Sequence, residues 1–242
     1  MSPEARNLLW AVAVFLAALA FGASSIVIPD FGGFAPDQFP IPQEDPPVQP
    51  AGYAFAIWGV IYLWLLASAG FGLIARRDAP DWAEMRPMLA LSLVVGASWL
   101  AVAKLSALAA AVLIWAMLIP ALVALFRAPL LDRWWGRAPL GLYAGWLSAA
   151  SVVAVGLVLS GWGLMGPVPA ALLCIVVATL LAASVQVALE GTPEYGLGVV
   201  WALVAVAVHN LALGTLVVAI LAFAGAGLVG LLAIRAITFP RS

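Results

Sequence analysis

Charged side chains are scarce in this sequence. Asp, Glu, Lys and Arg make up 9% of the 242 residues, whereas hydrophobic residues make up 66%. Water-soluble domains carry about a quarter charged residues, so this chain cannot cover itself with a polar surface. Its charges stand in short clusters between apolar runs of about 20 residues, the length that a helix needs to cross a bilayer. We therefore predict an integral membrane protein with the lipid bilayer as its environment. The net charge of −1 gives no reason to expect a nucleic acid partner.

Residues suited to catalysis or metal binding are also few. The sequence contains one cysteine, Cys174, and one histidine, His209. A single cysteine excludes an intrachain disulfide, and we interpret Cys174 as a packing residue because it lies in an apolar run. No group of His, Cys, Asp and Glu has the spacing of metal ligands, and no Ser-His-Asp set or glycine-rich phosphate loop is visible. We therefore predict no catalytic residues, no metal site and no enzymatic activity.

Hydropathy divides the chain into eight apolar spans. They are 7–28, 51–75, two within 87–127, 140–159, 167–189, and two within 193–235. The first double run must turn back near the polar Lys104 and Ser106. We place the second turn at His209-Asn210, with Gly214 as the alternative. Thr192-Pro193 is typical of a helix start, with threonine as the N-cap and proline in the first turn. The pattern predicts an all-α, polytopic transmembrane helix bundle.

A proline-rich loop, 29–50, separates the first two spans. It holds seven prolines, four acids and no Lys or Arg, so it cannot be a helix interior and must lie outside the membrane. Basic residues alternate between the two sides with a strong bias. One side receives Arg6, Arg76, Arg77, Arg86, Arg127, Arg133, Arg137, Arg235 and Arg241, and the other receives Lys104 alone. The positive-inside rule then predicts a multi-pass protein of the cell membrane with both termini cytoplasmic and the loop 29–50 external.

Small residues recur at helical spacing on two spans. Gly141, Gly145 and Ala149 form a stripe every four residues, and Gly225, Gly227 and Gly230 lie on the last span. Such stripes let helix backbones approach closely in lipid. We expect helix packing from them, and either a homodimer or association with another membrane protein.

Tryptophan is abundant, with 11 residues. Phe55, Trp58 and Tyr62 share one helical face at i, i+3 and i+7, and Tyr143 and Trp146 do the same at i, i+3. Further tryptophans lie inside the third, fourth and seventh spans: Trp99, Trp115 and Trp201. Aromatic rings with hydroxyl and indole donors suit a flat, largely apolar ligand. We predict a ligand pocket between the second and fifth spans, with ordinary core packing as the alternative.

Two segments carry a family resemblance. Residues 46–62 (PPVQPAGYAFAIWGVIY) and 139–150 (PLGLYAGWLSAA) are similar to the TspO/MBR family, the tryptophan-rich sensory proteins related to the translocator protein. The resemblance places residues 1–160 on that family's five-helix core. It assigns residues 161–242 to the three-helix C-terminal extension of its longer bacterial members. Compact members have a proline between the Phe and Trp of the second helix and an asparagine near position 154, where this chain has Ala154.

The resemblance also implies a binding site beneath the loop that joins the first two helices. Compact members bind tetrapyrroles and other hydrophobic molecules there and are described as sensors, transporters or regulators. The matching positions here are Tyr53, Phe55, Trp58, Tyr62, Tyr143 and Trp146. A porphyrin or another tetrapyrrole is therefore a candidate ligand.

Three functions follow as hypotheses. The leading one is a membrane receptor or transport protein that binds a flat hydrophobic ligand, for example a tetrapyrrole. The alternative is an accessory or assembly subunit that packs against a larger membrane complex. The third is an enzyme acting on a tetrapyrrole or lipid, with His209 and Lys104 as its only candidate acid-base or ligand groups.

Overall fold

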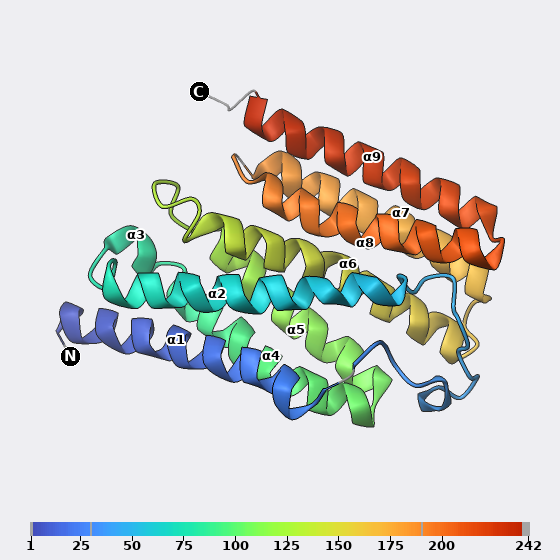
Figure 1. The fold of residues 1–242 in the computed structure, drawn as a ribbon, viewed down its shortest axis with the longest axis horizontal. Coiled ribbons are helices and arrows are strands. Elements are labelled where there is room, and N and C mark those ends of the chain that lie inside the picture. Colours follow the sequence, from blue (N-terminus) through green and yellow to red (C-terminus); the bar gives the residue numbers. More distant parts are fainter. Residues whose placement is uncertain (1, 30, 190, 239–242) are drawn as a thin grey trace.

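The apolar spans fold into long helices that lie side by side in one bundle (Figure 1). The computed structural model describes residues 2–29, 31–189 and 191–238. The long helices are α1 (Pro3–Val27), α2 (Ile57–Ile74), α4 (Arg86–Leu105), α5 (Ala107–Phe126), α6 (Arg137–Gly161), α7 (Pro167–Ala188), α8 (Pro193–Leu213) and α9 (Leu216–Thr238). Two 3-10 turns, Pro36–Gln38 and Gly52–Ala56, and the short helix α3 (Pro80–Ala83) complete the elements. Within the described residues, 8 helices are long and apolar enough to cross a membrane, which confirms the predicted polytopic all-α bundle.

The first hairpin turn lies where the sequence predicts it. Leu105 ends α4, and Ser106 then adopts an extended backbone conformation. The Ser106 hydroxyl accepts a hydrogen bond from the amide of Ala109 at 3.2 Å, so this residue is the N-cap of α5. One polar side chain therefore stops one helix and starts the next.

The second hairpin turn does not lie at His209-Asn210, so that prediction was wrong. Both residues belong to α8, which ends at Leu213, and the alternative, Gly214, makes the turn with a left-handed φ of 74°. Asn210 is tolerated inside the helix because its side-chain amide donates to the carbonyl of Pro47 (2.7 Å) and to that of Val206 (2.8 Å). The polar residue that suggested a turn is an anchor for the external loop instead.

The helix α6 occupies the middle of the bundle. It contacts α2 and α5 on one side and α7 and α8 on the other, while α1 and α4 lie beyond the first pair and α9 beyond the second (Figure 1). The glycine stripe makes the contact with α8. A Cβ on Gly145 would overlap the carbonyl oxygen of Tyr195, and one on Gly198 would lie 2.7 Å from the amide nitrogen of Trp146. The stripe therefore packs against a helix of the same chain. The division into domains at residue 160 stays a prediction.

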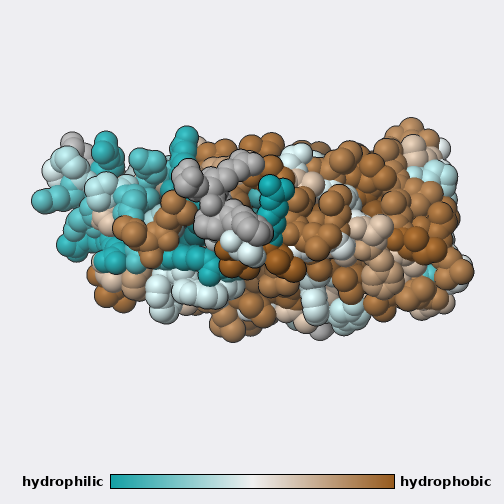
Figure 2. All heavy atoms as spheres, turned by 90° about the horizontal axis from the view of Figure 1, so that it is seen from above, coloured by the Kyte–Doolittle hydropathy of each residue, from teal (hydrophilic) through white to brown (hydrophobic). Residues whose placement is uncertain are grey.

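Charged residues gather at one end of the bundle. The helices α1, α4, α6 and α8 begin at this end and α9 ends there (Figure 1). We call it the arginine-rich end, and its described arginines are Arg6, Arg76, Arg77, Arg86, Arg127, Arg133, Arg137 and Arg235. Arg241 lies outside the described residues. Figure 2 shows hydrophilic residues over this end and a mainly hydrophobic surface along the rest of the length, as expected for a protein in a bilayer.

The opposite end, which we call the loop end, carries the residues from Ile28 to Ala51 that join α1 to the turn before α2 (Figure 1). Lys104 lies exposed at this end, on the last turn of α4. The arginines at one end and Lys104 at the other agree with the alternation of basic residues that the sequence shows.

Thr192 precedes α8, as the sequence predicts, but its hydroxyl has another partner. It accepts a hydrogen bond from Arg137 Nε at 2.5 Å, and no hydrogen bond from the first turn of α8 reaches it within the described residues. The start of α8 is thereby connected to the start of α6 at the arginine-rich end.

Candidate ligand-binding site

The external loop folds back over the helix ends at the loop end. Three hydrogen bonds fix it to three different helices: Gln38 Nε2 to Ala103 O (2.9 Å), Ile41 N to Gly161 O (2.9 Å) and Asn210 Nδ2 to Pro47 O (2.7 Å). A further bond runs from the amide of Ala51 to the carbonyl of Ala205 at 3.1 Å. The loop is therefore an ordered cover over α4, α6 and α8.

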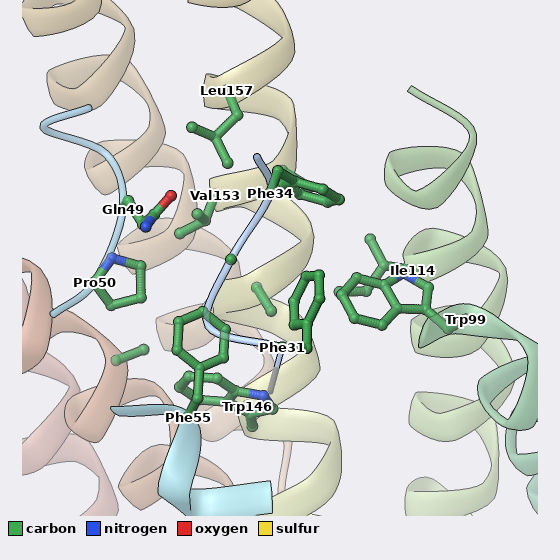
Figure 3. A pocket seen from close by; sticks show the side chains of 14 residues that line it. Phe31, Phe34, Gln49, Pro50, Phe55, Trp99, Ile114, Trp146, Val153 and Leu157 are labelled. Atoms are coloured by element: carbon green, nitrogen blue, oxygen red, sulfur yellow. The ribbon is translucent and has the colours of Figure 1, made fainter. Parts of the chain in front are cut away.

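A largely apolar cavity lies beneath this cover. Phe31 and Phe34 line it from the loop, Phe55 from the turn before α2, Trp99 from α4, and Trp146 and Val153 from α6 (Figure 3). About 50 Å³ of it is open to the centre of a water-sized sphere. A single water needs roughly 10–15 Å³ on that measure, whereas pockets for drug-sized ligands enclose about 300–1,000 Å³. The open space is therefore smaller than a ring compound needs.

Two of the six predicted site residues line the cavity directly. These are Phe55 and Trp146, whose ring centroids are 6.1 Å apart. Trp58 meets the indole of Trp146 edge to face at 6.1 Å, and Tyr62 stacks on Trp58 at 5.4 Å. Trp58 and Tyr62 therefore support the cavity wall from behind, one ring contact away from its interior.

Tyr143 and Tyr53 lie further from the cavity. Tyr143 is fully buried, and its hydroxyl lies 2.8 Å from Ser92 Oγ. Because Ser92 Oγ donates to the carbonyl of Met117, Tyr143 is the donor in that pair. Tyr53 is 48% exposed and packs edge to face on Trp201. Tyr143 thus belongs to the bundle core, whereas Tyr53 lies on the outer surface beside α8.

The indole N–H of Trp146 is the unusual polar group of the site. Trp146 is only 2% exposed, and its Nε1 is buried without a hydrogen-bond partner among the described residues. The other tryptophan of the lining differs, because Trp99 Nε1 donates to the carbonyl of Ala110 at 3.0 Å. An unpaired buried donor costs about 1–3 kcal/mol, so native proteins rarely keep one without a reason. In Figure 3 the indole of Trp146 lies at one end of the cavity, next to Phe55.

The aromatic residues of the loop were missed by the sequence reasoning. The Phe31 ring meets Trp99 at 5.1 Å and Phe55 at 6.1 Å, and Phe34 meets Trp99 at 6.3 Å. Two phenylalanines flanking two glycines in an otherwise polar, proline-rich segment are the signal that could have identified them. Gly33 has a φ of 130°, a conformation that L side chains rarely adopt, so the segment between the two rings requires glycine.

The site is electrostatically neutral inside and acidic around its cover. The described residues that line the cavity include no Asp, Glu, Lys or Arg. Besides the indoles of Trp99 and Trp146, the polar side chain among them is that of Gln49. The cover carries Asp37, Glu44 and Asp45 on its exposed surface. Within residues 2–29, 31–189 and 191–238, no group of three His, Cys, Asp or Glu side chains could hold a metal ion.

Eight apolar helices with an aromatic cavity at one end define a multi-pass membrane protein of the helical-bundle class. Residues 8–235 match the family model described as TSPO-like protein, and the chain therefore belongs to the TSPO-like family. Comparisons with curated proteins and with solved structures found no match to this chain.

Proposed function

We propose that this chain is a non-enzymatic membrane receptor or carrier that binds a hydrophobic molecule in the cavity beneath the loop. The observation that carries the proposal is the unpaired N–H of Trp146, buried at the wall of a largely apolar space. Pockets for small molecules combine apolar walls with a few polar groups that orient the ligand. A flat ring system, for example a tetrapyrrole, suits walls made of aromatic side chains.

Binding requires the loop to move. The open space of about 50 Å³ cannot hold a ring compound, and Phe31 and Phe34 line it from the loop, with their ring centroids 5.8 Å apart. We therefore propose that the ligand takes the place of these two rings, which swing away with the glycines between them. The three hydrogen bonds that anchor the loop further along the chain can stay intact while this segment opens.

The site has a defined place in the proposed topology. The arginine-rich end lies on the cytoplasmic side of the cell membrane and the loop end on the outer side, because basic residues are retained in the cytoplasm. The ligand then enters from the outer face or from the outer leaflet.

A titration in lipid nanodiscs tests the proposal. The chain is mixed with a panel of hydrophobic ring compounds that includes a porphyrin, and tryptophan fluorescence is followed, with empty nanodiscs as the correction for partitioning. We expect saturable quenching, weakened by Trp146→Phe and unchanged by Trp115→Phe, because Trp115 is not among the lining residues. If no compound gives saturable quenching in the wild-type chain, the proposal is wrong.

One observation that suggested the alternative role, an assembly subunit, no longer supports it. The stripe of Gly141 and Gly145 is occupied by α8 of the same chain, so it offers no free surface to a partner. Purification in a mild detergent distinguishes the two roles, because a stoichiometric second protein would support the subunit role.

A further inference from the structure

We propose that the segment joining α5 to α6, residues 127–136, lies in the membrane interface and binds the phosphate group of an anionic phospholipid. We call this segment the α5–α6 loop. It lies at the arginine-rich end of the bundle, away from the ligand cavity, so the proposal is independent of the proposed function (Figure 1). It depends on three observations: exposed apolar side chains, ring contacts that hold the loop alongside α2, and an arginine without a protein partner.

The α5–α6 loop exposes large apolar side chains at the polar end of the molecule. Leu131 is 92% exposed and Trp134 is 61% exposed, and their neighbours Leu130 and Trp135 are exposed as well. Surfaces that face water rarely present such side chains together. In a bilayer, leucine favours the acyl chains and the indole ring favours the headgroup region. The side chains of this loop therefore suit a lipid interface.

Two stacked pairs of rings fix the loop against α2. The Trp134 ring stacks on that of Trp64 with the centroids 6.3 Å apart, and Trp64 Nε1 donates to the carbonyl of Trp134 at 2.9 Å. The Trp135 ring stacks on that of Phe71 at 5.0 Å, with 11° between the planes. The exposure of the apolar side chains is therefore a property of a fixed loop.

The ring contacts also set the depth of the loop. The helix α2 ends at Ile74, and Trp64 precedes this end by ten residues, which correspond to about 15 Å along the helix axis. Phe71 lies in the last turn of the same helix. The loop therefore lies beside the last turns of a spanning helix, at the level where headgroups meet acyl chains.

A non-helical segment can occupy this level only if its backbone polar groups have partners. The carbonyl of Asp132 accepts hydrogen bonds from the amides of Trp135 (2.9 Å) and Gly136 (2.8 Å). The carbonyl of Trp134 accepts the one from Trp64 Nε1. The turn thus pairs these groups within the protein, and its outer surface is left to apolar side chains.

Arg127 supplies the charge that a phosphate needs. Its side chain is exposed and forms no ion pair or hydrogen bond with the described residues, whereas Arg133 is paired with Glu194. The acid of the loop, Asp132, is already paired with Arg76, so it does not compensate Arg127. A guanidinium can lie along apolar surface and bind two phosphate oxygens at once. The uncompensated charge favours a phospholipid with a net negative charge over a zwitterionic one.

A fluorophore on the loop tests its environment. Leu131→Cys is labelled with a nitrobenzoxadiazole group in nanodiscs, and the wild-type chain, whose Cys174 is buried, gives the background. We expect quenching by phospholipids that carry a nitroxide on the acyl chain and protection from iodide in the water. Asp78→Cys, on the exposed turn after α2, is the matched control and should show the opposite pattern.

Each other pattern at Leu131 overturns the proposal. Strong quenching by iodide with weak quenching by the lipid nitroxide would place the loop in water. Weak quenching by both would mean that protein covers the loop, either a second copy of this chain or another subunit. Because Leu131 is almost fully exposed, its replacement should leave the fold unchanged, and helix content by circular dichroism checks this.

A second comparison tests the charge. Nitroxide-labelled phosphatidylglycerol and phosphatidylcholine are added to the labelled Leu131→Cys chain at equal mole fraction. We expect about fivefold enrichment of the anionic lipid at the loop, the effect of one arginine near an anionic surface. Adding Arg127→Gln should remove the enrichment, whereas Arg235→Gln should keep it, because α9 packs on α7 and α8. Equal quenching by the two lipids in the chain with Arg127 intact would overturn the anionic preference.

Discussion

At the arginine-rich end, ion pairs and hydrogen bonds from arginine side chains to backbone carbonyls connect the helices, whereas at the loop end aromatic rings surround a cavity. Arg86 donates from one guanidinium to the carbonyls of Gly72, Arg76 and Arg77, which closes the last turn of α2. Arg133 forms an ion pair with Glu194. At the loop end, aromatic contacts dominate, and Trp146 Nε1 has no partner in the part of the chain that the structure describes.

The difference indicates that the two ends of the bundle have different roles, one in stability and the other in ligand binding. Ion pairs and hydrogen bonds to backbone carbonyls fix helix ends in single positions, because breaking them leaves a charge or a carbonyl without a partner. Ring contacts between loop and helices are weaker and can be replaced by equivalent contacts with a ligand. We therefore expect mutations at the arginine-rich end to act on stability and those at the loop end to act on binding. The helix α6 runs through both ends.

Gly145→Ala should have the largest effect, because it disturbs the contact that holds the two halves of the bundle together. The added Cβ would overlap the carbonyl of Tyr195, and backbone atoms cannot move aside as a side chain can. We expect a loss of at least about 3 kcal/mol of stability, seen as aggregation on size-exclusion chromatography after mild heating. Gly59→Ala is the matched control, because a Cβ at Gly59 meets nothing within 4 Å. Equal behaviour of the two variants would contradict the packing of α6 on α8.

Arg133→Ala should destabilise the arginine-rich end without changing ligand affinity. It leaves the buried Glu194 carboxylate without its cation, and because Arg133 is partly exposed we expect a loss of about 2 kcal/mol. The double variant Arg133→Ala with Glu194→Gln should recover part of this loss, because it removes the stranded charge. Thermal unfolding followed by tryptophan fluorescence provides the measurement. A weaker ligand affinity in the nanodisc titration, with unchanged stability, would contradict the claim that the arginine-rich end acts on stability and not on binding.

Much of the fold could be predicted because it depends on simple properties of single residues. The length of the apolar spans and the bias of the basic residues predicted the eight helices, and the polar Ser106 predicted the first hairpin turn. The second turn was misplaced because polarity was taken as the signal for leaving the membrane. Asn210 stays buried in α8 since the carbonyl of Pro47, more than 160 positions away in sequence, accepts its amide hydrogen bond. No local pattern contains that contact.

The site could be predicted only in part for the same reason. The spacing of Phe55 and Trp146 within two aromatic segments of the sequence pointed to residues that line the cavity. Helical spacing also selected Tyr143, which faces the core and donates to Ser92. The loop rings Phe31 and Phe34 have no periodic spacing, so their position depends on how the loop folds back over the bundle. The unpaired state of Trp146 Nε1 is a property of the assembled cavity and cannot be read from its sequence neighbours.

Phe31→Ala should change both stability and ligand affinity at the loop end. Removing this half-buried ring takes away its contacts with Phe55 and Trp99 and enlarges the cavity. We expect a stability loss of about 1 kcal/mol without ligand, and tighter binding of ring compounds because they no longer compete with the chain's own ring. Titration of wild type and variant with the same compound gives the measurement. Weaker binding by the variant would mean that Phe31 is part of the binding surface and is not displaced.

The smallest expected effect is the acid sensitivity of the arginine-rich end. Asp132 accepts hydrogen bonds from Arg76 Nε (2.6 Å), from Arg76 Nη2 (2.9 Å) and from Trp82 Nε1 (2.9 Å). The Arg76 guanidinium holds the pKa of Asp132 below its usual range, with a further contribution from the Trp82 hydrogen bond. Because the pKa is lower in the folded state, the ionised carboxylate adds stability above the unfolded pKa of about 4, and this contribution disappears as the pH falls through the folded value.

Asp132→Asn therefore should flatten the pH dependence of stability below about pH 5. The effect should stay near 1 kcal/mol or less, because Arg76 is largely exposed and water screens the pair. Thermal unfolding between about pH 3 and about pH 7, a range that brackets the usual aspartate pKa of about 4, measures it, with Arg127→Ala as a control for lost surface charge. Ligand affinity of the variant in the nanodisc titration at neutral pH should match that of wild type, because the cavity lies at the other end of the bundle. Parallel stability curves for wild type and Asp132→Asn would show that the Arg76–Asp132 pair does not fix this end.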